Sequence, residues 1–97
     1  MAGTFSVEWL PGGILLQRRG GLFTVDEAKS YAAAAKAAIK KAPARWGALV
    51  DAREAVAQTD EVQAIIQDLI KYVVANNVTR VAIVTKSALA GIQQRRI

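Results

Sequence analysis

The feature that most constrains this chain is a run of four consecutive apolar residues, Val81-Ala82-Ile83-Val84, three of them β-branched. A strand with one face in water alternates, so a continuous run predicts a strand buried on both faces, as in a parallel sheet covered by helices. Residues Trp46–Asp51 have the same form, and a strongly apolar helical pattern separates the two runs. We therefore expect Trp46–Asp51 and Arg80–Thr85 to be neighbouring parallel strands, joined by a right-handed crossover through a helix.

The N-terminal part of the chain predicts a β-hairpin and a helix. Extended runs over Phe5–Leu10 and Ile14–Arg19 flank the turn residues Pro11-Gly12-Gly13, which is typical of a hairpin. Thr24 and Glu27 have the spacing of a capping box, so a helix should begin there and run to about Lys41. Its expected apolar stripe consists of Val25, Ala28, Ala32, Ala35 and Ile39.

Two further helices are expected. A loop over Ala52–Gln58 leads to Thr59, whose hydroxyl suits an N-cap, and apolar residues then recur at helical spacing until Asn76-Asn77. Asn tolerates the left-handed conformation that ends many helices. After Arg80–Thr85, Ser87 is expected to cap a short helix that contains Ala88, Leu89 and Ile92 and ends near Arg96.

Length and composition exclude several classes of protein. The chain has 97 residues and no internal repeat or linker, which predicts one domain over residues 1–97. It has no cysteine and no histidine, so disulfides, thiol nucleophiles, the usual zinc ligands and the usual neutral-pH base are missing. We expect no cofactor and no metal. No run is long enough to span a membrane and no signal peptide is recognisable, so a cytoplasmic location is expected.

The formal net charge of +5 raises the question of nucleic-acid binding. However, the basic residues form small separate groups, at Arg18-Arg19, at Lys40-Lys41 with Arg45, and at Arg95-Arg96. No group is interleaved with aromatic residues. The pattern therefore favours a solvated basic surface over a nucleic-acid interface.

The order of these elements, and the wording of several segments, resembles the SpoIIAA-like (STAS/SEC14-type) bacterial domains over essentially the whole chain. The segments that carry the resemblance are Gly20-Gly21-Leu22-Phe23-Thr24, Ala48–Arg53, Arg80–Val84 and Gln93–Ile97. The resemblance implies an α/β fold with a mixed sheet covered by helices, in the order ββαβαβα. It also implies a regulatory, protein-binding role.

The chain departs from that family in two respects. Where anti-sigma-factor antagonists carry a phosphorylated serine in an Asp-Ser-Ser-Gly-type motif, this chain reads Ala57-Gln58-Thr59-Asp60-Glu61. Thr59 is the possible modification site, although a phosphate there would face the carboxylates of Asp60 and Glu61. Family members also usually carry one more strand and a closing helix. Because exposed sheet edges are normally paired or covered, we expect a homodimer with or without exchanged elements.

A candidate binding site is expected beyond the carboxyl ends of the two parallel strands, where open parallel sheets collect ligands. Lys86 and the first amides of the last helix, near Ser87, could hold an anion, and the Arg53 guanidinium could join them. In the competing interpretation, Asp51 pairs with Arg53 and Ser87 only caps a helix. This competing interpretation is favoured over anion binding because the chain has no Gly-rich phosphate loop.

Two other sets of residues are candidates for function. Asp51 is the one acid expected in a cleft, but no second carboxylate is placed to work with it, which does not favour catalysis. Trp9, Tyr31, Trp46 and Tyr72 could line an apolar pocket, but packing in the core or at its rim is the favoured role. The sequence thus favours a non-enzymatic protein-interaction or regulatory module that self-associates. The alternative is a binder of a small acidic or lipid-like ligand at the strand ends.

Overall fold

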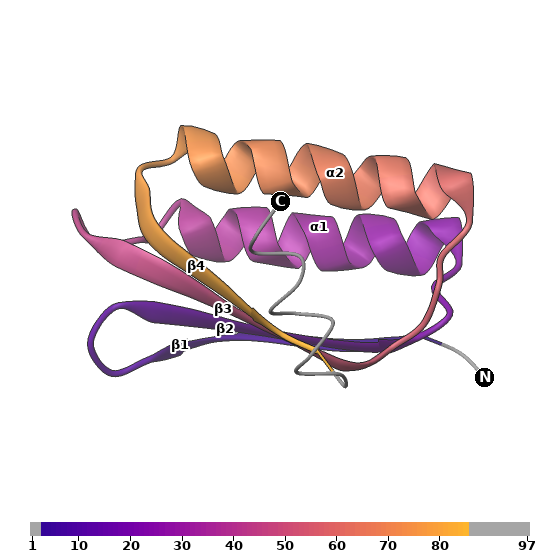
Figure 1. Ribbon diagram of the computed structural model, residues 1–97. Helices are drawn as coiled ribbons and strands as arrows, with labels where there is room; N and C mark the ends of the chain where they lie inside the picture. The colour runs from indigo at the N-terminus through magenta and orange to yellow at the C-terminus, as the bar shows by residue number, and fades with distance from the viewer. Residues whose placement is uncertain (1–2, 86–97) are drawn as a thin grey trace, which may run out of the picture.

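The computed structural model describes residues 3–85, in which four strands form one mixed sheet and two helices lie together on one face of it (Figure 1). The elements are β1 (Thr4–Leu10), β2 (Ile14–Gly21), α1 (Val25–Ile39), β3 (Trp46–Ala55), α2 (Asp60–Ala75) and β4 (Val78–Val84). The spatial order of the strands is β1-β2-β3-β4, with β1–β2 antiparallel and the other two pairs parallel. The predicted mixed sheet and the order ββαβαβ are confirmed, whereas the helix predicted over Ser87–Arg96 lies outside the described residues.

The turn between β1 and β2 has the backbone that its glycines predict. Gly12 and Gly13 have φ angles of +87° and +76°, which side chains rarely allow. The Gly13 carbonyl accepts a hydrogen bond of 2.9 Å from the Gly47 amide at the start of β3. The hairpin turn is therefore also tied to the central strand.

Both helices begin where their caps predict. At α1, the Thr24 hydroxyl accepts from the Glu27 amide and the Glu27 carboxylate accepts from the Thr24 amide, at 3.1 and 2.8 Å. α1 ends at Ile39 rather than near Lys41, because the amides of Lys41 and Ala42 bond three residues back and tighten the chain into a turn. α2 begins after Thr59 and ends at Ala75, with Asn76 as its C-cap, and Asn77 has the predicted left-handed conformation, with φ +63°.

The core lies between the sheet and the two helices. Leu15 of β2, Ala48 of β3 and Tyr31 of α1 are buried there, and the predicted alanine stripe of α1 faces the same interior. One polar pair is buried among them, because the Tyr31 hydroxyl donates a 2.9 Å hydrogen bond to the Gln17 side-chain oxygen. A buried amide needs such a partner.

Two expectations about β3 and β4 were wrong in detail. β3 continues through Ala55, so half of the expected loop over residues 52–58 is strand, paired with the end of β2. β4 is not buried on both faces: Val81 is 46% exposed and Ile83 is 51% exposed. The reason is its position, because within residues 3–85 it is the last strand of the sheet and both helices lie on one face (Figure 1).

Candidate functional site at the ends of β2 and β3

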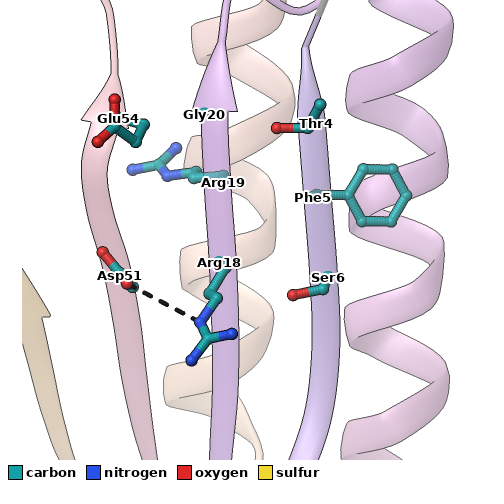
Figure 2. A pocket seen from close by; sticks show the side chains of 8 residues that line it. All are labelled: Thr4, Phe5, Ser6, Arg18, Arg19, Gly20, Asp51 and Glu54. Atoms are coloured by element: carbon teal, nitrogen blue, oxygen red, sulfur yellow. Dashed lines mark ion pairs between the residues drawn. The ribbon is translucent and has the colours of Figure 1, made fainter.

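Charged side chains gather where β2 and β3 approach their carboxyl ends, on the face of the sheet opposite the helices. The parallel register places Arg18 of β2 beside Asp51 of β3, and the Arg18 Nε lies 3.9 Å from an Asp51 carboxylate oxygen (Figure 2). The same register places Val84 of β4 on the other side of Asp51. The end of β4 therefore borders this cluster.

Arg53 holds Asp51 with a planar fork of hydrogen bonds. Its Nε donates to one carboxylate oxygen at 3.0 Å and a terminal nitrogen donates to the other at 2.8 Å, while its backbone amide adds a third bond at 3.2 Å. The register between β2 and β3 shifts just after the Arg18–Asp51 pair, so a β-bulge lies beside this contact.

This pairing shifts the pKa values of both residues. The hydrogen bonds from Arg53, aided by the charges of Arg53 and Arg18, lower the pKa of Asp51 from its ordinary 3.8 to about 2. The same contacts raise the pKa of Arg53. Asp51 is therefore a stable anion at neutral pH, and such a carboxylate is a poor general acid and a weak base.

A shallow hollow of about 300 Å³ lies beside this cluster. Its lining consists of Thr4, Phe5, Ser6, Arg18, Arg19, Gly20, Asp51 and Glu54, which come from β1, β2 and β3 (Figure 2). The strands approach closely at its upper end, since a Cβ on Gly20 would lie 2.9 Å from the Glu54 Cβ. Arg18 stands over the hollow with most of its side chain in solvent. The hollow can therefore offer a cation to an incoming group.

The loop that follows β3 is held by one side chain, that of Gln58. Its amide nitrogen donates to the carbonyls of Gly21 and Val56, and its oxygen accepts from the Phe23 amide, at 2.8–2.9 Å. These bonds fix the loop to the end of β2. Leu22 and Val56, which flank the bonds, remain 47% and 53% exposed. Two large apolar side chains thus stand in solvent on a well-supported backbone.

The structure brings together only part of the predicted site. Asp51 and Arg53 lie together and bind each other, as the competing interpretation of the sequence holds, whereas Lys86 and Ser87 lie outside the described residues. Thr59 is exposed at the start of α2, where its hydroxyl accepts from the Val62 amide at 3.4 Å. It is a cap, and its modification stays a prediction.

The aromatic residues pack against one another. Trp9 and Trp46 meet edge to face with ring centres 5.8 Å apart, and Phe5 and Phe23 each lie against Tyr31. The Trp46 indole nitrogen also donates to the Asn76 carbonyl at 2.9 Å. Tyr72 is half-buried beside the Lys36 ammonium, which lies 5.4 Å from the ring centre.

Sequence reasoning missed Arg18 and Gln58 as parts of the site. The position of Arg18 beside Asp51 depends on the register between β2 and β3, which no local pattern specifies. The Gln58 side chain donates a hydrogen bond to the carbonyl of Gly21, which lies 37 residues away in the sequence. The one available signal was the pair Gly20-Gly21, because adjacent glycines indicate a close backbone approach.

Two further observations concern the described part of the chain. In residues 3–85 no three acidic side chains lie close enough together to hold a metal ion. No helix in this range has the length and apolar character needed to cross a membrane.

The fold has a counterpart among solved structures. The chain is similar to the crystal structure of an antisigma-factor antagonist, a STAS domain from Rhodobacter sphaeroides, with a TM-score of 0.62. The match covers 82% of this chain and 85% of that one, at 13% sequence identity. No family model and no curated protein match the chain. The chain therefore has a STAS/SpoIIAA-like fold, which the resemblance in sequence predicted.

Proposed function

We propose that this protein is a non-catalytic, regulatory protein-interaction module that binds its partner at the ends of β2 and β3. The observation that carries the proposal is the pair Leu22 and Val56, large apolar side chains exposed on a backbone that Gln58 holds in place. Apolar anchors with arginine nearby are the usual anatomy of a protein interface. Arg18 and Arg53 supply that arginine on the same end of the sheet.

The chemistry of the site supports binding over catalysis. Asp51 is fixed as an anion by Arg53, and its pKa of about 2 leaves no proton to donate near neutral pH. The chain contains no cysteine or histidine that could serve as a nucleophile or base beside it. The similar STAS domain is an antisigma-factor antagonist. This likeness supports the proposal that the present chain also acts by binding another protein.

The test is affinity capture with a matched set of baits. The baits are the unaltered chain, a Leu22→Asp/Val56→Asp variant, and a control with Ala33→Asp on the exposed side of α1. We expect one protein to be retained by the unaltered chain and the control but not by the double variant. Titration calorimetry with the purified partner should reproduce that order. Equal binding of the partner by all three baits would refute the proposed interface.

The proposal includes self-association. Within residues 3–85, β1 and β4 are the two edge strands, and β4 carries the exposed apolar side chains of Val81, Ile83 and Val84 with one charged residue, Arg80. We expect sedimentation velocity at micromolar concentration to show a dimer. A single monomeric species would contradict this part of the proposal without affecting the partner interface.

A second candidate function is binding of a small acidic or lipid-like ligand near Asp51, Arg53, Lys86 and Ser87. It is favoured by a small surplus of cations there, since the three arginines Arg18, Arg19 and Arg53 accompany the two carboxylates of Asp51 and Glu54. A ligand should raise the melting temperature of the protein, and either Arg18→Ala or Lys86→Ala should abolish the rise. The Ala33→Asp variant serves as the control. A rise that survives both substitutions would place the ligand elsewhere.

A further inference from the structure

The face of the sheet opposite the helices is open within residues 3–85, and Figure 2 looks onto it with the helices behind the strands. Because side chains alternate along a strand, every second residue of β2 and of β3 lies on this open face. The parallel pairing of the two strands sets these residues side by side in three rows: Ile14 with Gly47, Leu16 with Leu49, and Arg18 with Asp51. The open face therefore has an apolar centre and a charged pair at one end.

The charges of the open face cancel, although the chain as a whole is strongly basic. Within residues 3–85, strand alternation and pairing place three cations and three anions there: Arg18, Arg53 and Arg80, with Glu8, Asp51 and Glu54. Arg19 alternates to the helix side of β2, where it lines a hollow with Gln17 and Tyr31. The formal net charge of +5 therefore comes from other surfaces. Two copies of this chain would repel each other least through the open face.

We propose that the open face binds a second copy of the chain, with the two sheets packed face to face. The two-fold axis would run parallel to the strands, between β2 and β3. The inference rests on the proposed self-association and names the surface that mediates it. Such an axis sets β2 of one copy over β3 of the other, at the same level along the strands.

This arrangement covers the apolar centre of each copy with that of the other. Ile14 would lie over Gly47 of the second copy, and Leu16 would lie over its Leu49. Ile14 is 38% exposed within the single chain, and Gly47 has no side chain to obstruct it. The row therefore places a projecting side chain over an unobstructed position, on both sides of the axis at once.

The charged row selects this axis. The same rotation sets Arg18 of each copy over Asp51 of the other, so two equivalent ion pairs form together. A two-fold axis perpendicular to the strands would set β2 over β2, and β2 contributes no carboxylate to the open face. Within one chain the Arg18 Nε lies 3.9 Å from the Asp51 carboxylate, and most of the Arg18 side chain is in solvent. Arg18 can therefore turn towards the carboxylate of a second copy.

The outer strands complete the rim of the interface. The rotation sets β1 of one copy over β4 of the other, so Arg80 would lie over Leu10 and one step along the strand from Glu8. An apolar centre with charged residues around it is the usual anatomy of a protein interface. Leu22 and Val56 lie beyond the ends of β2 and β3, so the proposed partner interface is not part of the open face.

The first test exchanges the two charges and measures the dimer by sedimentation velocity at micromolar concentration. Arg18→Asp and Asp51→Arg each place like charges across the axis, and each should weaken the dimer at least about tenfold. An equimolar mixture of the two variants should regain the dimer, because each copy then presents the charge that the other needs. A mixture that stays monomeric would overturn the proposed arrangement. If the unaltered chain were itself monomeric, the proposed self-association would fail and this inference with it.

The second test compares two isoleucines on opposite faces of the sheet, Ile14 and Ile83, which are 38% and 51% exposed. Ile14→Asp should abolish the dimer and Ile83→Asp should retain it, while circular dichroism shows both variants to be folded. The reverse order would mean that the copies meet on the helix side of β4. That result, or equal dimerisation of the two variants, would overturn this inference and leave self-association standing.

Discussion

β3 and β4 have nearly the same pattern of residues and very different surroundings. Each has a short apolar core flanked by polar residues, and the two are paired in parallel. In β3, Trp46 and Ala48 are 2% and 5% exposed, whereas Val81 and Ile83 of β4 are about half exposed. The difference follows from position in the sheet, since β3 has a strand on both sides and β4 has one within residues 3–85. The apolar pattern alone therefore does not report how deeply a strand is buried.

The two faces of β3 differ as well. The side chains that face the helices are apolar and enclosed, whereas Asp51 points to the opposite face, where Arg18 and Arg53 bind it. A strand buried on one face can carry a charged cluster on the other without burying a charge. This is why β3 can contribute to the candidate site although it is one of the two central strands of the sheet.

The largest expected effect tests the contrast between β3 and β4. Trp46→Ala removes a buried ring and a hydrogen bond to the Asn76 carbonyl, and should cost about 3–5 kcal/mol in the free energy of unfolding. Val84→Ala, on the exposed face of β4, should cost about 1 kcal/mol or less. Urea unfolding followed by circular dichroism measures both. Similar costs would show that β4 is as enclosed as β3.

A smaller effect tests the polar pair within the enclosed core. Tyr31→Phe leaves the Gln17 side-chain oxygen without its buried donor and should cost about 1–3 kcal/mol. Gln17→Leu combined with Tyr31→Phe should cost less than the two single changes together, because the pair is lost as a unit. The measurement is a double-mutant cycle by urea unfolding. Strict additivity would mean that the two groups do not depend on each other.

The smallest effect concerns the charged face of β3 and appears only in acid. Because the folded-state pKa of Asp51 is below its ordinary 3.8, its contribution to stability is complete above about pH 4 and is lost as the pH falls towards about 2. Urea midpoints between pH 5 and pH 2 should fall less steeply for Asp51→Asn than for the unaltered chain. The Asp26→Asn variant, in the first turn of α1, provides the comparison. Parallel curves for Asp51→Asn and the unaltered chain would show that the pairing has no such effect.

Local signals were enough to predict most of the elements. Thr24 with Glu27, Thr59, and Asn77 mark helix ends by bonds or conformations that depend on a few neighbouring residues. The hairpin turn at Gly12-Gly13 is of the same kind. The candidate site could be predicted only in part. Asp51 and Arg53 are two residues apart, so their pairing could be predicted from the sequence, whereas Arg18 lies beside Asp51 only because β2 pairs with β3.

The sequence by itself determined the elements, their order and the parallel pairing of β3 with β4, because helical spacing, capping and unbroken apolar runs are properties of short segments. Only the tertiary structure decided that both helices lie on one face of the sheet and that β4 is an edge strand of the sheet formed by residues 3–85. It also decided that the Gln58 side chain binds the loop to the Gly21 carbonyl. These depend on register and on the order of strands in space, which join residues that are far apart along the chain (Figure 1).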